Sequence, residues 1–182
     1  MARVPYVNRD DLDPEGQKIY DQIRQDRNRP EVGLQFRALL NSPKAAGHLT
    51  SLGAQLRFHT SMPENLKELA IILVAREWNS HIEWTGHSLL AASAGVSQGS
   101  IESVRTCQAP QGLTDEEAVI ARYVYEVLRD KKVSNATFTA AHRMLGDRGV
   151  VDLTLTISYY TALAVAQTAL ELEMEPGRVS TL

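Results

Sequence analysis

The sequence predicts an all-α protein, a single-domain bundle of about eight helices with short connections. Signals that start helices recur at short intervals, whereas the alternation of apolar and polar residues typical of strands is missing. No cluster of Pro or Gly is long enough to serve as an interdomain linker. With 182 residues, 43% of them hydrophobic, the chain can bury a sizeable core. We therefore expect one domain spanning residues 1–182.

The first two helices are predicted from the residues that precede them. Asp13 and Pro14 open a helix, with Asp13 as the N-terminal cap and Pro14 at the first helical position. Ser42 and Pro43 repeat this pattern and lead into a segment that runs to about His59. Each pair is typical of a helix N-terminus, because proline lacks the N–H that would otherwise remain unpaired there.

The central helices follow the same logic. Ser61 and Glu64 predict a capping box around Pro63, and the run 66–74 behind it is hydrophobic on all sides, so we expect it to be buried. Further along, Gly95 stands where a C-terminal cap belongs. Ser97 can then start a short helix that ends near residue 104.

The last helices are predicted from a second capping box and from a long uncharged segment. Thr114 and Glu117 form the box, and a helix follows whose apolar residues have helical spacing. Residues 135–145 form another helix that ends at Gly146. Residues 153–170 form the C-terminal helix. The apolar residues of the helix behind the box are Val119, Ile120, Tyr123, Val127 and Leu128.

The C-terminal segment 153–170 has no formal charge over 18 residues, which is the minimum length of a transmembrane helix. Its four threonines, Gln167 and two adjacent tyrosines dilute its hydropathy, and its flanks, Asp152 and Glu171, are acidic. We expect this helix in the protein core or at a subunit contact, and we expect no membrane partner.

Charge and cysteine content exclude several classes of protein. The net charge of -3 leaves no basic stripe for a phosphate backbone, so nucleic acid is not an expected partner. The lone Cys107 rules out an intrachain disulfide and a CxxC pair, and it fits a reducing compartment. The first residues carry no apolar signal segment. We therefore expect a cytoplasmic protein.

The most informative stretch is PENLKELAIILVAREWNSHIEWTGH, residues 63–87, in which four polar residues interrupt an apolar helical region. These residues are Glu68, Ser80, Glu83 and His87. A carboxylate buried beside an imidazole is costly to desolvate unless the two are paired, so these groups require a structural or a chemical explanation.

Glu83 and His87 are four residues apart, so on a helix they lie on one face, and Ser80 lies within about 60° of both in azimuth. A carboxylate there can hold the imidazole in one tautomer and raise its basicity, as a general acid and base near neutral pH requires. In the purely structural alternative, Ser80 caps the helix, Glu83 completes the capping box, and His87 is a packed surface residue.

Glu68 can join this pair only if the helix breaks. In one straight helix it would lie about 22 Å along the axis from Glu83. A break at Asn79 and Ser80 would fold the segment into an antiparallel pair and bring the Glu68 side chain within reach of His87. The structural alternative is a glutamate near a helix N-terminus, stabilised by the helix dipole.

This spacing resembles the carboxymuconolactone decarboxylase and alkylhydroperoxidase D (AhpD) superfamily, whose thiol peroxidase members carry Glu, Cys, Cys and His at these four positions. Here the cysteine positions hold Ser80 and Glu83. The similarity extends through SPKAAGHLTSLGAQLRFHTSMPENLKELA and AASAGVSQGSIESVR, around a motif region of residues 61–105. It implies the antiparallel pair, an AhpD-like helical fold, and a homo-oligomer, either a trimer or a hexamer.

The resemblance, together with the loss of both motif cysteines, implies decarboxylation or isomerisation of a small anionic lactone or keto acid without a cofactor. In this hypothesis His87 donates the proton and Glu83 orients the imidazole of His87. Glu68 is a second proton relay, and Ser80 binds substrate or caps the helix. Two alternatives stay open. One is an alkylhydroperoxidase-like peroxidase, which the missing cysteines disfavour, and the other is a non-enzymatic binding relative.

Other residues near the motif are weaker candidates for a functional role. The repeat of EWNSHI and EWTGHS suggests Glu77, His81, Glu83 and His87 as metal ligands, but positions six apart lie about 120° apart on a helix, so we expect no metal. An anionic substrate would need a cation, and the candidate cations are Arg57, Arg76 and Arg105. Trp78 and Trp84 are candidates for an apolar wall beside the motif.

Overall fold

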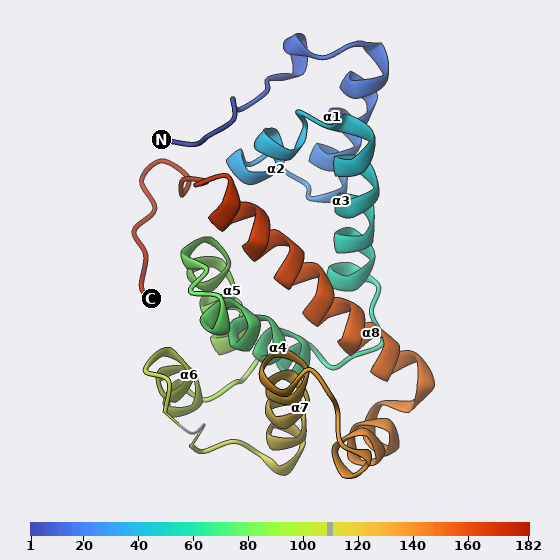
Figure 1. The fold of residues 1–182 in the computed structure, drawn as a ribbon, viewed down its shortest axis with the longest axis vertical. Coiled ribbons are helices and arrows are strands. Elements are labelled where there is room, and N and C mark those ends of the chain that lie inside the picture. The colour runs from blue at the N-terminus through green and yellow to red at the C-terminus, as the bar shows by residue number, and fades with distance from the viewer. Residues whose placement is uncertain (109–110) are drawn as a thin grey trace. The chain divides into compact units, whose positions relative to one another are not determined.

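The computed structural model describes residues 1–108 and 111–182, and every regular element in these two ranges is helical (Figure 1). The described part of the chain contains eight α-helices, one 3₁₀ helix (η1) and one π-helix (η2), so the all-α prediction is confirmed. In chain order the elements are η1 Arg9–Asp11, α1 Pro14–Asp26, α2 Leu34–Leu39, α3 Pro43–Phe58, α4 Glu64–Glu77, α5 His81–Ser93, α6 Gln98–Arg105, α7 Asp115–Tyr125, η2 Glu126–Asp130 and α8 Asn135–Ala169.

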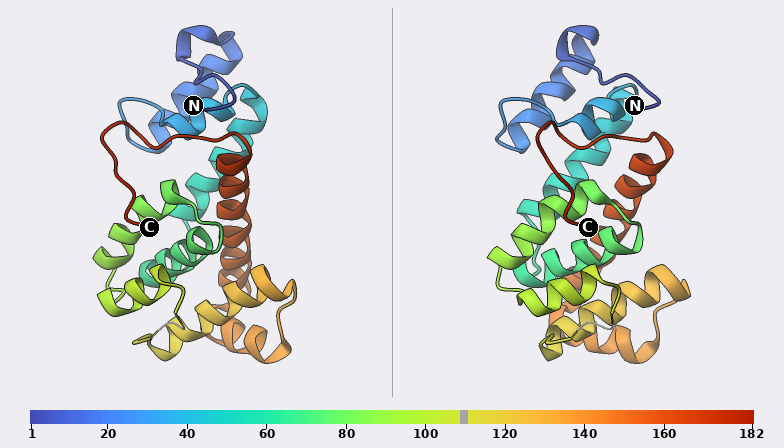
Figure 2. Two further views of the ribbon diagram at one scale, coloured as in Figure 1. Left: turned by 60° about the vertical axis from the view of Figure 1, so that its left-hand side comes forward. Right: turned by 90° about the vertical axis from the view of Figure 1, so that its left-hand side faces the viewer.

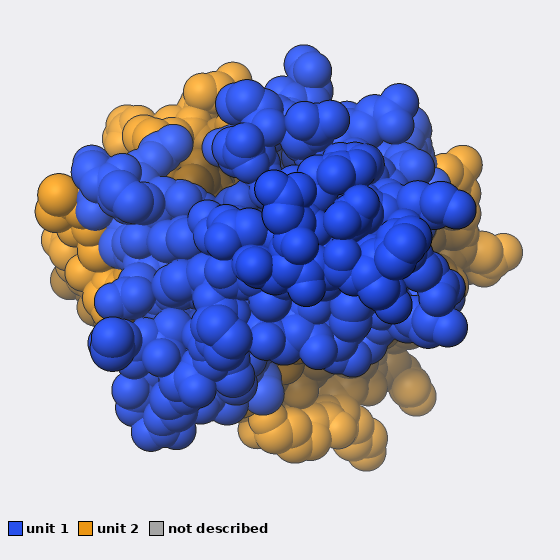
Figure 3. Space-filling view, turned by 90° about the horizontal axis from the view of Figure 1, so that it is seen from above, with its two compact units in different colours: residues 1–59, 165–178 blue, residues 60–164, 179–182 orange. Residues whose placement is uncertain are grey.

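The chain divides into two compact units, which Figure 3 colours separately. The first unit contains residues 1–59 and 165–178, and the second contains residues 60–164 and 179–182. A single domain over residues 1–182 therefore stays a prediction. All four residues of the sequence motif belong to the second unit.

In the first unit, α3 packs against both α1 and α2. The carboxylate of Asp13 accepts the N–H of Gly16 at 2.7 Å, and Pro14 is the first residue of α1, as predicted. α3 begins at Pro43 and ends at Phe58, with His59 as its C-terminal cap. The signal at α1 is confirmed in full. At α3, Ser42 occupies the N-cap position and Pro43 the first helical position as predicted, but the Ser42 side chain makes no capping hydrogen bond.

In the second unit, α4 is the central helix and packs against α5, α6 and α7. Its residues from Leu66 to Ala75 are all buried, which confirms the prediction for the apolar run. α5 ends at Ser93 and is followed by Gly95 with a φ of 99°, a left-handed conformation that glycine adopts without steric cost. Ser97 caps α6 as predicted, accepting the N–H of Ser100 at 3.0 Å.

One predicted capping box is wrong and the other is confirmed. Pro63 is the N-terminal cap of α4, whereas Ser61 donates its N–H and its hydroxyl to the carboxylate of Asp152 at 2.9 and 3.1 Å. Asp152 thus accepts both donors of Ser61, and the Glu64 carboxylate accepts from Lys67 instead, so neither half of the box forms. The box formed by Thr114 and Glu117 at the start of α7 is present.

The helix that follows this box keeps α geometry only to Tyr125. Residues 126–130, which include the predicted helical positions Val127 and Leu128, form the π-helix η2. Beyond it, α8 is broken at Gly146, where φ is 68° and ψ is -178°, so the end predicted for residues 135–145 is confirmed. In Figure 2, the part of α8 before this break is orange, and the part after it runs from dark orange to red.

α8 includes an 18-residue window that is long and apolar enough to cross a membrane. Half of the residues in that window are buried inside the protein, as in the core helix of a soluble protein. Leu153, Ile157 and Leu163 provide this buried face. Composition alone therefore does not make α8 a membrane span.

Candidate active site

The site depends on a sharp reversal between α4 and α5. Asn79 has a φ of 50°, in the left-handed region that asparagine tolerates better than most residues. Its N–H donates to the carbonyl of Arg76 at 3.1 Å, and the N–H of Ser80 donates to the carbonyl of Ala75 at 2.7 Å. Because these two bonds satisfy the last carbonyls of α4, the helix ends there. The predicted break at Asn79 and Ser80 is confirmed.

Ser80 also begins the next helix. Its hydroxyl oxygen accepts the N–H of Glu83 at 3.3 Å, which makes Ser80 the N-terminal cap of α5. The two helices joined by this reversal pack against each other, and both Ser80 and Glu83 are buried. Ser80 is therefore a helix cap, and its contact with a substrate stays a prediction.

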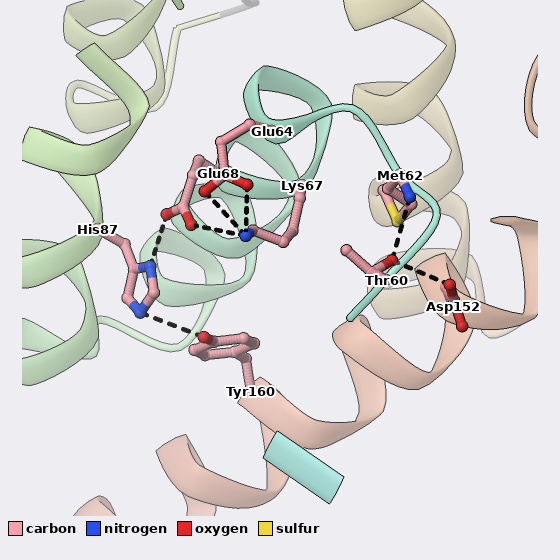
Figure 4. A network of polar contacts seen from close by, with 8 residues as sticks. All are labelled: Thr60, Met62, Glu64, Lys67, Glu68, His87, Asp152 and Tyr160. Carbon is pink, nitrogen blue, oxygen red and sulfur yellow. Dashed lines mark hydrogen bonds and ion pairs between the residues drawn. The ribbon is translucent and has the colours of Figure 1, made fainter. Parts of the chain in front are cut away.

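The closest contact in the site joins Glu68 of α4 to His87 of α5. Oε2 of Glu68 lies 2.6 Å from Nδ1 of His87, and the two residues are only 1% and 5% exposed (Figure 4). A contact this short between a carboxyl oxygen and an imidazole nitrogen in a buried setting is a hydrogen bond, whose donor depends on which of the two groups carries the hydrogen. This bond fixes the orientation of the ring.

The other ring nitrogen faces α8. Nε2 of His87 lies 3.2 Å from the hydroxyl oxygen of Tyr160, and the two rings meet edge to face with centroids 5.0 Å apart. Oε2 of Glu83 lies 3.6 Å from the same nitrogen, which is beyond an ordinary hydrogen bond. Tyr160 is 2% exposed, so this side of the ring is also shielded from water.

A buried lysine completes the group of polar residues. Nζ of Lys67 lies 2.7 and 2.8 Å from the two carboxylate oxygens of Glu64, and 3.6 Å from Oε1 of Glu68. In Figure 4, Glu68 lies between Lys67 and His87, with Tyr160 on the opposite side of the imidazole. Ion pairs and hydrogen bonds thus form a chain from Glu64 to Tyr160.

The structure brings together the four residues chosen from the sequence, Glu68, Ser80, Glu83 and His87, around one bend. It differs from the sequence hypothesis in one respect. Glu83 was expected to orient the imidazole, but the carboxylate in hydrogen-bond contact with the ring is that of Glu68. The catalytic roles of Glu68, Glu83 and His87 stay predictions.

Sequence reasoning missed Lys67 and Tyr160. Tyr160 is 73 positions from His87, so no local spacing connects the two residues. Its hydroxyl within an uncharged helix was the only available signal, because a buried phenol usually has a hydrogen-bond partner. For Lys67, the signal was a lysine inside a run of residues predicted to be buried.

The four residues of the EWNSHI and EWTGHS repeat do not converge. Glu77 pairs with Arg129, with 2.9 Å between Oε2 and the guanidinium Nε, and Nδ1 of His81 contacts the hydroxyl of Ser180 at 2.6 Å. Across residues 1–108 and 111–182, no three His, Cys, Asp or Glu side chains are grouped so that they could hold a metal ion.

The remaining candidates are placed as follows. Trp84 is buried, whereas Trp78 is 39% exposed, so of the two only Trp84 has the burial expected of a residue in an apolar wall. Cys107 is exposed, beyond the end of α6. It therefore lacks the buried setting of the four motif residues.

The three candidate arginines are engaged elsewhere. Arg76 donates to the carbonyl of Arg105 at 2.8 Å and pairs with Asn79, and Arg105 pairs with Glu102 at 2.6 Å. Arg57 belongs to the first unit, where its guanidinium lies 5.2 Å from the ring centroid of Phe58.

No family model and no curated protein matches the sequence. Among solved structures, the chain is similar to the debrominase Bmp8 without ligand, with a TM-score of 0.73, 13% identity, and coverage of 95% of this chain and 92% of that chain. A cysteine-to-alanine variant of Bmp8 in complex with 2,3,4-tribromopyrrole gives a TM-score of 0.73 and 13% identity, with 95% and 91% coverage. At this identity the likeness shows that the chain shares an all-helical fold with Bmp8.

Proposed function

We propose that this protein is a cofactor-free enzyme that carries out general acid/base chemistry on a small molecule, with Nε2 of His87 as the atom that transfers the proton. One observation carries this proposal, namely the buried 2.6 Å contact between Glu68 and Nδ1 of His87. Because Nδ1 is held by a carboxylate, Nε2 is the nitrogen left for chemistry.

Two groups would assist at Nε2. The hydroxyl of Tyr160, at 3.2 Å, can pass a proton to the ring or donate a hydrogen bond to a developing oxyanion. A substrate atom at Nε2 would also be within reach of Glu83, whose carboxylate faces the same nitrogen at 3.6 Å. Burial excludes water, which strengthens each of these interactions.

The resemblance to carboxymuconolactone decarboxylases supports a small lactone or keto acid as the substrate. In a decarboxylation, the bond to the carboxylate carbon breaks, carbon dioxide leaves, and the electron pair stays on the remaining carbon as an enolate. The protonated imidazole of His87 then delivers its Nε2 proton to that carbon. No nucleophile and no redox step are required.

A second candidate substrate is a halogenated aromatic heterocycle. It is favoured by the fold shared with a debrominase that has been captured with 2,3,4-tribromopyrrole. Arg76 and Arg105, two of the cations that an anionic substrate could pair with, donate to other groups of the protein. Their engagement favours a neutral substrate over an anionic one. Reductive removal of bromine would consume two electrons, and the only cysteine, Cys107, is exposed and outside the site, so an external reductant would have to supply them.

The test is a substrate panel of lactones, keto acids and bromopyrroles, assayed for release of carbon dioxide or bromide. We expect His87→Ala to lower the rate by about 10² to 10⁴-fold, the usual contribution of a general acid/base. The matched control is His142→Ala, which removes an exposed histidine that pairs with Asp147. Equal rates for wild type and His87→Ala would remove His87 from the mechanism. Binding without turnover would instead favour the non-enzymatic relative.

The peroxidase alternative has its own assay. Consumption of an organic hydroperoxide in the presence of a thiol donor is expected to be absent, since the site contains no thiol. Peroxide turnover that disappears in Cys107→Ser would establish the peroxidase and overturn the acid/base proposal.

A further inference from the structure

Lys67 is an ammonium group in a place where a charge is costly. The residue is 2% exposed, and burying such a group without partners costs several kcal/mol or more. Its partners are Glu64, whose side chain is 62% exposed, and Glu68, whose side chain is 1% exposed. Lys67 therefore places a positive charge between a carboxylate at the surface and the carboxylate that holds His87.

The 2.6 Å contact between Glu68 and His87 can be made in two ways. In one, an ionised Glu68 accepts the Nδ1–H of the imidazole. In the other, a protonated Glu68 donates to a bare Nδ1, and the ring hydrogen is on Nε2. The second arrangement holds one proton more than the first, so the pair passes from the first to the second by taking up a proton from solvent. Only in the first arrangement is Nε2 bare and ready to accept a proton from a substrate.

We propose that Lys67 is a positioning residue that selects the first arrangement. Its ammonium, 3.6 Å from Oε1 of Glu68, keeps that side chain as a carboxylate, so Nδ1 of His87 always carries a hydrogen and Nε2 is the nitrogen that exchanges protons. This inference rests on the proposed acid/base role of His87, since only that role makes the choice of nitrogen matter for turnover.

The charges around the ring are consistent with this role. Two buried carboxylates, Glu68 and Glu83, flank one imidazole, at 2.6 Å from Nδ1 and 3.6 Å from Nε2. Nζ of Lys67 lies 3.6 Å from Oε1 of Glu68. An opposite charge at this range stabilises the ionised form of the carboxyl group that it touches. Lys67 thus stabilises the charge of the carboxylate on the side of the ring where hydrogen must be retained.

The experiment is NMR of the full chain labelled with ¹⁵N-histidine, comparing wild type with Lys67→Met and Lys67→Arg. In the wild type we expect Nδ1 of His87 to have the chemical shift of a protonated nitrogen across the neutral range. In Lys67→Met, which keeps an unbranched side chain of nearly the same length and removes its charge, we expect Glu68 to take up a proton from solvent and the ring hydrogen to be on Nε2. Lys67→Arg should restore the wild-type pattern.

The control is Glu64→Gln, which removes the other partner of Lys67 at an exposed position. Its His87 spectrum should match the wild type. A Lys67→Met spectrum with Nδ1 still protonated would overturn the proposal, as would a change of equal size in Glu64→Gln. If Lys67→Met does not fold, the wild-type spectrum still decides, because hydrogen on Nε2 and a bare Nδ1 would contradict the proposal.

Kinetics separate this inference from the function on which it rests. With a substrate in hand, Lys67→Met should lower kcat by about 10² to 10⁴-fold with little change in KM, and Lys67→Arg should recover most of it. If no substrate is turned over, the acid/base function fails, while the NMR comparison still reports whether Lys67 sets the tautomer. The ring hydrogen of His87 could move to Nε2 in Lys67→Met while kcat stays normal. In that case the position of this hydrogen does not limit turnover, and the positioning role of Lys67 is contradicted.

Discussion

At the scale of single residues, His87 is distinguished by having different partners on its two nitrogens. Glu68 holds Nδ1 with a short bond, and Nε2 faces a phenol and a second carboxylate. In enzymes where a carboxylate holds a general base, the histidine is oriented on one side and reactive on the other, which is the role proposed for His87. The two glutamates should therefore differ in their effects.

Glu68→Gln and Glu83→Gln form a matched pair of substitutions. Each removes one negative charge and keeps the size of the side chain. Because Glu68 bonds the ring and Glu83 does not, we expect Glu68→Gln to lower kcat by about 10²-fold more than Glu83→Gln. Steady-state kinetics on the active substrate would measure this difference. A larger loss in Glu83→Gln would return the orienting role to Glu83.

Tyr160→Phe tests the other side of the ring. The phenyl group keeps the edge-to-face contact with His87, so the free energy of unfolding should fall by only about 1 kcal/mol, while kcat falls markedly. The control is Tyr123→Phe, which also removes a buried hydroxyl, in that case one bonded to Thr154 at 2.9 Å. Equal kcat losses in the two variants would mean that Tyr160 has only a structural role.

The sequence was sufficient to predict that Glu68, Ser80, Glu83 and His87 come together at one bend, because these polar residues stand out against an apolar background. Their catalytic roles stay predictions. The sequence was not sufficient to assign the hydrogen bond to Glu68, since the partner of a histidine depends on how two helices face each other. Tyr160 lay beyond any local pattern, because it reaches the site only through the packing of α8.

At the scale of elements, the reversal between α4 and α5 depends on the left-handed conformation of Asn79. Alanine in this conformation costs about 1 to 2 kcal/mol, whereas glycine adopts it freely. We expect Asn79→Ala to lower the free energy of unfolding by about 1 kcal/mol and Asn79→Gly to leave it nearly unchanged. Urea denaturation would measure both. Equal losses would show that the contact of the Asn79 side chain with Arg76 matters more than the backbone conformation.

Asp152 ties α8 to the segment that leads into α4. Burial alone would raise the pKa of Asp152, but hydrogen bonds from the N–H and hydroxyl of Ser61 and from the hydroxyl of Thr60 outweigh it and hold the pKa below its ordinary value of 3.8. A carboxyl group with a lowered pKa stabilises the folded state above the unfolded pKa. That contribution is lost as the pH falls through the folded pKa.

Asp152→Asn should therefore lower the thermal midpoint near neutral pH, and its deficit relative to wild type should shrink as the pH falls below about 4. Thermal unfolding of both proteins as a function of pH would measure this. A constant deficit at all pH values would show that the charge of Asp152 does not contribute.

Signals that act within one helical turn predicted the elements well, as the caps at Asp13, Ser97 and Thr114 show. The prediction failed at Ser61, whose partner Asp152 is 91 positions away in the sequence. It also missed the π-helix at residues 126–130, where the chain leaves regular spacing. Local signals cannot anticipate a competing long-range acceptor.

At the scale of the whole molecule, all-α architecture was predictable because each helix is encoded by its own residues. The division into two compact units was not, because it depends on which helices pack together. Assembly stays a prediction. Val151 and Leu155, four positions apart on α8, are 56% and 38% exposed, and exposed apolar residues at helical spacing are typical of subunit contacts.

We expect light scattering to give the mass of a trimer or a hexamer of the 20.2 kDa chain. Leu155→Lys should reduce that mass if α8 lies in the interface, because it would bury an unpaired charge there. The control is Leu89→Lys, which places the same charge at an exposed leucine of α5. A wild-type monomer would contradict the expected homo-oligomer.

The most direct test of the account is incorporation of deuterium at carbon when the protein turns over its substrate in D₂O. If Nε2 of His87 delivers the proton, the wild-type product carries one deuterium on a single face of the carbon that lost the carboxylate. The small amount of product formed by His87→Ala takes its deuterium from solvent and is labelled on both faces. Labelling of one face with equal selectivity by the two proteins, or labelling of both faces by the wild type, would contradict the account.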